Sequence, residues 1–170
     1  MFHTVPLLEH SPKVISAIQN ETAVGHHPTR VLSSINVFLQ FWGAALSPKA
    51  GSVGYAVEPF LPSILSHNAA PTAYPPTRDH VYFPLALYAV WVDATYDNEF
   101  YDAIRQSAAR IRDVAIQDGQ DITKAPLYPN YAMFDTPLSD MYGSNVDKLR
   151  SLKQRVDPHN VMGLAGGFKF

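Results

Sequence analysis

The segment PLYPNYAMFDTPLSDMYGSNVDKLRSLKQRVDPHNVMGLAGGFKF, residues 126–170, carries the strongest structural signals of the chain. A helix is predicted there from Ser144 to about Arg155, because apolar residues recur at helical spacing and would form its buried seam: Val146, Leu149, Leu152 and Val156. Asp157–Pro158 ends this helix, since the residue before a proline is pushed out of the helical region. Before the helix, residues 125–131 are predicted to form a strand.

The rest of the chain predicts the same mixture of strands and helices. A second helix is expected from Asn98 to about Gln117, with an apolar stripe on its core-facing side: Phe100, Ile104, Ala108, Ile111 and Ala115. Further strands are expected from alternation and apolar runs at 31–42, 53–60 and 80–92, and Ser11–Pro12 predicts the start of a short helix. These elements predict an α+β fold: a mostly antiparallel sheet with helices packed on one face, in one domain of residues 1–170.

Composition narrows the class of protein. With 46% hydrophobic and 16% charged residues, the 170-residue chain is typical of a globular protein. Its net charge of −2 is spread without basic blocks, so we expect no nucleic-acid partner. The sequence shows no signal-peptide pattern and no apolar run of membrane-spanning length, which predicts a cytoplasmic protein that does not engage a membrane. The chain has no cysteine, which excludes disulfides, thiolate metal sites and a cysteine nucleophile.

Few patterns carry chemistry. Phosphate-loop, dinucleotide-binding and nucleophile-elbow patterns are absent, and no histidine spacing indicates a metal site. Strand alternation would place Tyr128 and Asn130 on one face and Tyr131 on the other. A buried Asn flanked by phenols can hold a carbonyl, an enol or a flavin ring edge by hydrogen bonds. The structural alternative is an edge strand whose Asn caps a turn.

Four motifs follow one another in this region: Tyr128-x-Asn130-Tyr131, MYG at 141–143, NVDKLRSLKQRVDPHNV at 145–161 and a terminal GGFKF. In this order they resemble the C-terminal end of berberine bridge enzyme-like, FAD-linked oxidases, especially the fungal members of secondary metabolism. The resemblance extends more loosely through YAVEPFLPSIL at 55–65 and VWVDATYDNEFYDAI at 90–104. It implies the substrate domain of such an enzyme, an antiparallel sheet backed by helices. It also implies that Tyr128, Asn130 and Tyr131 line the reaction cavity and that Glu58 faces it.

The sequence departs from the family in its cofactor-binding part. The FAD domain, with its Gly-rich pyrophosphate loop and its His and Cys anchors, has no counterpart here, so we expect no cofactor. The resulting hypothesis is a cofactor-independent, non-redox enzyme of secondary metabolism: a cyclase or pericyclase (Diels–Alderase-like), or an isomerase, acting on a reactive apolar small molecule. The alternative is a non-catalytic remnant of a flavin-dependent oxidase that binds a metabolite or docks to a partner chain.

This hypothesis assigns two groups of side chains to the cavity. The catalytic candidates can polarise a carbonyl or move a proton: Asn130, Tyr128, Glu58 and His80. The substrate-binding candidates supply the walls: Tyr131, Tyr82, Tyr88, Trp91, Phe38, Gln40 and Trp42. In the family the flavin domain covers this side of the sheet, so its absence would expose an aromatic surface. A homodimer would cover that surface, and we expect one.

Overall fold

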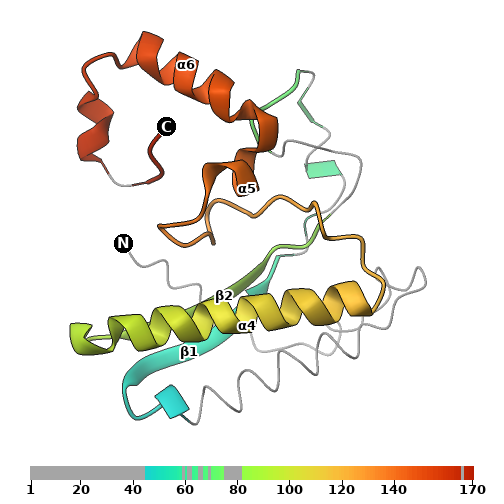
Figure 1. Cartoon of the computed structure of the whole chain (residues 1–170), viewed down its shortest axis with the longest axis vertical. Coiled ribbons are helices and arrows are strands. Elements are labelled where there is room, and N and C mark those ends of the chain that lie inside the picture. Colours follow the sequence, from blue (N-terminus) through green and yellow to red (C-terminus); the bar gives the residue numbers. More distant parts are fainter. Residues whose placement is uncertain are drawn as a thin grey trace. The chain divides into compact units, whose positions relative to one another are not determined.

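The computed structural model describes residues 45–58, 60, 63–64, 67–68, 70–74, 82–165 and 167–170. The described residues form two compact units. Unit 1 lies within residues 45–54 and 88–123, and unit 2 lies within residues 55–87 and 124–170. Two strands and several helices follow along the chain (Figure 1): β1 Ala50–Val57, β2 Leu85–Trp91, η1 Ala94–Tyr96, α4 Asp97–Gln117, α5 Leu138–Tyr142, η2 Gly143–Asn145, α6 Val146–Val156 and η3 Val161–Leu164. This mixture confirms the predicted α+β class.

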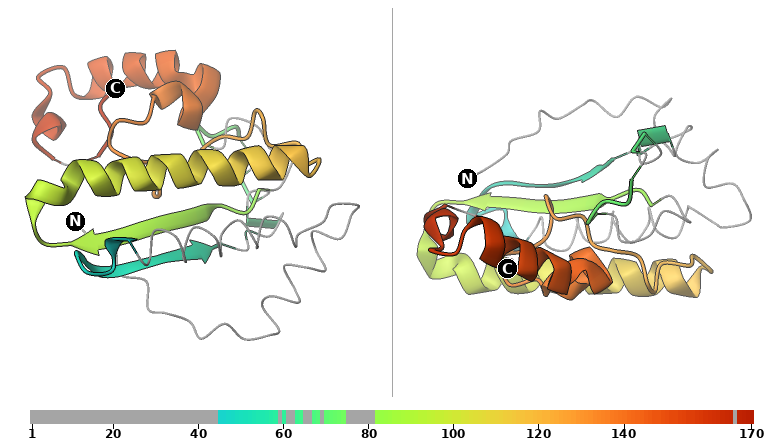
Figure 2. Two further views of the ribbon diagram at one scale, coloured as in Figure 1. Left: turned by 60° about the horizontal axis from the view of Figure 1, so that its bottom comes forward. Right: turned by 90° about the horizontal axis from the view of Figure 1, so that it is seen from above.

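β1 and β2 pair as a two-stranded antiparallel sheet, and Figure 2 shows them side by side. The N–H of Glu58, just beyond β1, donates to the carbonyl oxygen of Pro84, just before β2, at 2.9 Å. Pro84 has no N–H to donate to a ladder, which explains why β2 begins at Leu85 and not at the predicted residue 80. β1 likewise overlaps the predicted strand 53–60 but starts at Ala50 and ends at Val57.

α4 confirms the predicted helix over 98–117 almost to the residue. The short helix η1, which leads directly into α4, is capped by Asp93: its carboxylate accepts hydrogen bonds from the Thr95 N–H at 2.9 Å and the Thr95 hydroxyl at 2.7 Å. At the end of α4, Gly119 adopts a left-handed φ of 87°, and the N–H of Gln120 reaches back to the carbonyl of Ala115 at 3.0 Å. This closing hydrogen bond is that of a Schellman motif, which needs the glycine.

The core of unit 1 lies between α4 and the sheet. Phe100, Leu46 and Ala103 are fully buried, and partly buried residues pack around them: Ala50, Val53, Ala89, Trp91 and Tyr96. Trp91 stacks on Phe100 with ring centroids 4.5 Å apart, and its indole N–H donates to the Asp97 carboxylate at 2.6 Å. Burial of these aromatic faces fixes α4 against one face of the sheet.

The buried stripe of α4 differs from the predicted one. The buried positions are Phe100, Ala103, Ser107, Ile111 and Ala115. Ile104 is only half-buried and Ala108 is exposed, so both predictions were wrong. Small side chains at 103 and 107 let the helix approach the sheet closely, and the Ser107 hydroxyl is satisfied by the Ala103 carbonyl at 2.6 Å.

In unit 2, α5, η2 and α6 contact one another. α6 confirms the helix predicted from Ser144 to about Arg155, and it ends at Val156, before Asp157–Pro158 as expected. Its predicted seam is only partly right: Val146 is buried and Leu149 is half-buried, but Leu152 and Val156 are 43% and 70% exposed. α5 and η2, which directly precede α6 in the chain, contact it, and the later part of its apolar stripe stays exposed.

The predicted strand at 125–131 is wrong. Residues 125–128 are irregular and 129–131 form a turn. Pro126 and Pro129 have no N–H for a ladder, and the N–H groups of Tyr131 and Ala132 instead turn back to the carbonyl of Tyr128, at 3.0 and 3.1 Å.

Several other expectations from the sequence stay predictions. The predicted strand 31–42 and the helix start at Ser11–Pro12 lie outside the described residues. The single-domain organisation and the placement of α6 on the α4 face of the sheet stay predictions. Within the described part of the chain, no helix is long and apolar enough to cross a bilayer.

Leu46 and Leu164 provide a matched test of the unit 1 core. Leu46 is 2% exposed and Leu164 is 94% exposed. Leu46→Ala should lower the free energy of unfolding by about 3 kcal/mol, because it leaves a cavity beside Phe100. Leu164→Ala should change it by less than about 0.5 kcal/mol. Urea unfolding followed by tryptophan fluorescence measures both, and equal losses would contradict this core assignment.

Candidate functional site

The site is built around a carboxylate and a phenol that are 73 residues apart in the chain. Glu58 directly follows β1, and the hydrogen bond from its N–H to Pro84 fixes its backbone at the end of the ladder. The hydroxyl of Tyr131 donates a hydrogen bond to Oε1 of Glu58. Both side chains are half-buried, so this charge-assisted bond is partly shielded from water.

The turn after Pro126 presents Tyr128 and Tyr131 together. Their ring centroids lie 5.1 Å apart with an edge-to-face angle of 86°. Strand alternation had placed them on opposite faces, and the turn at 129–131 overturns that prediction. The N–H of Leu127 also donates to the Asp140 carbonyl at 2.8 Å, which ties this segment to α5.

Further rings extend this pair into an aromatic cluster, defined here as Phe60, Tyr74, Tyr128, Tyr131, Tyr142 and Phe170. Tyr128 contacts the edge of Phe60 at 5.2 Å and Tyr74 at 5.8 Å between centroids. Tyr142 then bridges Tyr74, at 6.5 Å, and Phe170, at 5.3 Å. Each such pair adds about 0.5–1.5 kcal/mol beyond its buried area, so the rings hold five chain segments together.

Two phenols of the cluster, Tyr131 and Tyr74, have raised pKa values. Burial is the main cause that raises the pKa of Tyr131, and its hydrogen bond to Glu58 and the negative charges near it raise the pKa further. Burial, followed by repulsion from Tyr128 and Tyr142, raises the pKa of Tyr74 to about 12. Tyr131 is therefore a hydrogen-bond donor at neutral pH.

Tyr128 is oriented by its neighbour Asn130. The Asn130 side-chain amide donates to the Tyr128 hydroxyl oxygen at 2.7 Å. Asn130 is exposed, contrary to the expectation of a buried amide, since the turn carries its side chain outward. Among the described residues, no acceptor takes the proton of the Tyr128 hydroxyl, so this phenol can donate to a ligand oxygen.

The other predicted site residues are distributed differently. Tyr82 is half-buried in unit 2, in the irregular segment before β2. Tyr88 and Trp91 belong to unit 1, where Trp91 packs in the core against Phe100. The remaining predicted residues lie outside the described part of the chain: His80, Phe38, Gln40 and Trp42.

Sequence reasoning missed part of the cluster: Phe60, Tyr74, Tyr142 and Phe170. Tyr142 and Phe170 stand inside the motifs MYG and GGFKF, and Phe60 follows Glu58 by two residues, so the motifs contained a signal for three of them. Tyr74 stands in a proline-rich stretch without periodicity. Its place in the cluster follows from tertiary contacts alone.

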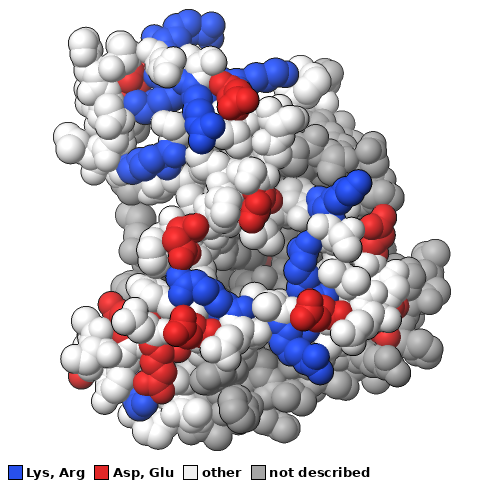
Figure 3. Space-filling model, viewed as in Figure 1, with Lys and Arg blue, Asp and Glu red and all other residues white. Residues whose placement is uncertain are grey.

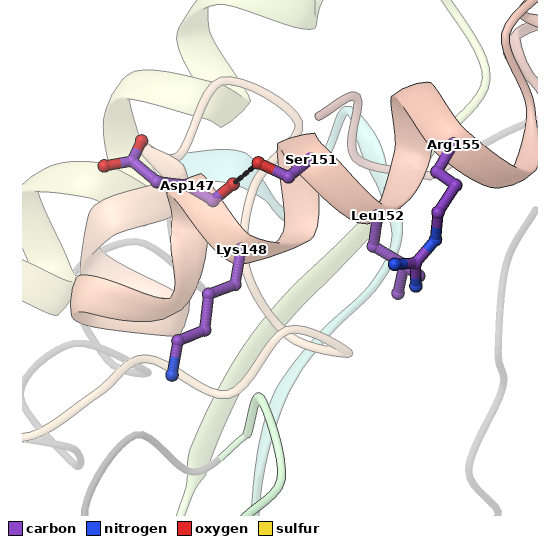
Figure 4. Close-up of a pocket in the computed structure, with 5 residues that line it drawn as sticks. All are labelled: Asp147, Lys148, Ser151, Leu152 and Arg155. Carbon is purple, nitrogen blue, oxygen red and sulfur yellow. Dashed lines mark hydrogen bonds between the residues drawn. The ribbon is translucent and has the colours of Figure 1, made fainter.

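A hollow of about 330 Å³ on α6 is not part of this site. It is lined by Asp147, Lys148, Ser151, Leu152 and Arg155. All five side chains come from one helix and are exposed (Figure 4), and the hydrogen bond drawn there joins the Ser151 hydroxyl to the Asp147 carbonyl at 2.9 Å. In the described ranges, no three His, Asp or Glu side chains group as metal ligands.

A family model described as Berberine and berberine like matches residues 127–165, under a quarter of the chain. The matched segment begins just before Tyr128, contains Tyr131 and continues through α5, α6 and η3. Neither the curated proteins nor the solved structures give a match. The matched segment therefore contains Tyr131 of the Glu58–Tyr131 pair but does not reach Glu58.

The resemblance implies FAD, whose pyrophosphate needs a particular backbone arrangement. Such a group binds at a Gly-rich connection from a strand to the start of a helix. The connection from β2 to α4 contains no glycine, its Asp93 carboxylate already accepts from the Thr95 N–H in η1, and Asp97 and Glu99 stand in the first turn of α4. These negative charges do not fit a pyrophosphate.

Tyr131 predicts a pH dependence of stability. The folded pKa lies above the ordinary value of 10.0, so between the two values the native state keeps a proton that the unfolded state has lost. The free energy of unfolding therefore falls as the pH rises above about 10. Tyr131→Phe should flatten this fall between about pH 10 and 12. Urea unfolding at several pH values measures it, and parallel curves for both proteins would contradict the buried-phenol assignment.

Proposed function

We propose that the chain is a cofactor-independent enzyme that moves a proton on an apolar small molecule bearing a carbonyl group, as an isomerase or a ring-closing enzyme. The observation that supports this most is the Glu58–Tyr131 hydrogen bond beside the Tyr128 hydroxyl. One carboxylate and two phenols meet there against aromatic rings. That set contains a base, its orienting group and a donor for a developing oxyanion.

Glu58 is the base in this proposal. Its carboxylate removes a proton from the carbon next to the substrate carbonyl, and the electron pair of the broken C–H bond moves to the carbonyl oxygen. Tyr131 donates to Oε1 of Glu58 and so orients the carboxylate. The neutral phenol also supplies a second proton carrier between the carboxylate and the ligand.

Tyr128 stabilises the oxygen on which negative charge develops. Asn130 occupies one lone pair of its hydroxyl, which directs the phenol proton outward to the ligand. Asn130 is thus a positioning residue, and Tyr128 is the group that touches substrate. A preorganised donor of this kind contributes about ten- to a thousandfold to the rate.

The fate of the enolate decides the product. Return of the proton to a different carbon gives an isomer, and attack of the enolate carbon on an electrophile in the same molecule gives a ring. Both outcomes balance without an oxidant or a reductant. The rings of Phe60, Tyr74 and Tyr128 favour a flat, apolar substrate, because they offer edges and faces that exclude water.

Hydrogen–deuterium exchange tests the proton-transfer step directly. 2-Tetralone, a fused-ring ketone with acidic C–H bonds, is incubated with the protein in D2O without flavin, and NMR follows loss of the C1 protons. Wild type should accelerate exchange over a no-protein control. Glu58→Gln should lower the catalysed rate by at least about 100-fold, and Tyr128→Phe by about ten- to a thousandfold.

Tyr101→Phe is the matched control, since it removes a phenol from α4 in unit 1, and it should leave the rate unchanged. Asn130→Ala should slow exchange less than Tyr128→Phe while the melting temperature stays the same. The proposal fails if wild type gives no exchange above background, or if Glu58→Gln retains the full rate in a folded protein.

The homodimer expected from sequence stays part of the proposal. Its support is three exposed apolar side chains on α6 and η3: Val156, Val161 and Leu164, which are 70%, 65% and 94% exposed. A second copy would cover such a surface. Light scattering at micromolar concentration should report twice the chain mass of 18.8 kDa, and a mass of 18.8 kDa would contradict it.

A further inference from the structure

A second hollow, of about 210 Å³, lies in unit 2 among α6, η3 and the C-terminal residues. It is lined by Lys153, Asn160, Met162, Gly163, Ala165, Phe168, Lys169 and Phe170. Unlike the hollow on α6, its walls come from three segments of the chain. They combine apolar side chains with two ammonium groups and an amide.

The charge in this hollow is positive. Lys153 is paired with Asp157, with 3.0 Å between its Nζ and Oδ2. Lys169 donates to the neutral carbonyl of Ala165, and within the described residues no ion pair joins it to an Asp or Glu side chain. The adjacent helix α6 adds to this field, with four basic residues against one acidic residue, and Figure 3 shows Lys and Arg gathered over it.

The apolar walls are aromatic and flexible. Phe170 is held edge-on by Tyr142, with ring centroids 5.3 Å apart, so one wall is anchored to the aromatic cluster. Met162 can adapt to the shape of a ligand on the opposite side. The Asn160 amide lies directly over Gly163, where even a Cβ atom would come within 2.4 Å of it, so the glycine leaves room for the amide at the rim.

We propose that this hollow binds a small aromatic carboxylate, as a site separate from Glu58 and Tyr131. The Lys169 ammonium would pair with the carboxylate, the Asn160 amide would donate to it, and the ring would lie between Phe170 and Met162. A volume of about 210 Å³ lies below the range of about 300–1,000 Å³ for drug-sized ligands, which limits the ligand to one or two rings.

The experiment uses 2-naphthoate as the probe and 2-naphthamide as a neutral probe of the same shape. Isothermal titration should show that wild type binds 2-naphthoate, with 2-naphthamide at least about tenfold weaker, because the amide lacks the charge that Lys169 recognises. The Met162 methyl resonance should shift on addition of 2-naphthoate, which places the ligand in this hollow.

Lys169→Gln should weaken 2-naphthoate binding about tenfold, and Lys169→Arg should restore most of it. Lys148→Gln is the matched control: it removes the same charge from the exposed face of α6, outside this hollow, and should leave binding unchanged. Melting temperatures identify any variant that has unfolded. If a variant has unfolded, the ratio of the affinities of wild type for 2-naphthoate and 2-naphthamide decides.

Three results would overturn the proposal: no binding of 2-naphthoate by wild type, equal binding of the two probes, or equal weakening by Lys169→Gln and Lys148→Gln. The last would indicate a general effect of net charge. The exchange assay with Glu58→Gln is independent of this hollow. Failure here therefore leaves the proton-transfer proposal standing, and failure there leaves this site standing.

Discussion

The hydrogen bond from Tyr131 to Glu58 is the constraint on which the candidate site depends. It joins the end of β1 to a turn 73 residues later, and nothing local in either segment would bring these side chains together. Burial of two polar groups is favourable only if they satisfy each other, so the pair fixes where the turn must lie within unit 2. Tyr128 and its aromatic neighbours then follow from the position of Tyr131.

Much of the fold could be predicted because its signals are local. α4 is fixed by apolar periodicity and a glycine terminator, and α6 by a proline after its last turn. The strand predicted at 125–131 failed because the alternation of side chains was weighed above two prolines that cannot join a ladder. The prediction of which α4 residues are buried failed for another reason. Small residues are buried there by close packing, and a search for large apolar residues at helical spacing does not find them.

The sequence resemblance pointed to residues of the candidate site but not to their geometry. Glu58, Tyr128 and Tyr131 were identified by resemblance, yet their pairing and the contact between the two rings required tertiary structure. Trp91 shows the opposite error, since an aromatic residue assigned to a cavity wall stacks in the unit 1 core. Aromatic abundance alone does not separate a wall from a core, because both bury the same apolar surface.

The central claim is that Glu58 and Tyr131 act as one proton-transfer unit. A double-mutant cycle of Glu58→Gln, Tyr131→Phe and the double variant, measured as the rate of deuterium exchange into 2-tetralone, tests it most directly. Residues that act as a unit give non-additive losses, so the double variant should be about as slow as Glu58→Gln alone. If all three variants are folded and the loss of exchange rate in the double variant equals the product of the two single losses, the two groups act independently. That result would contradict the account.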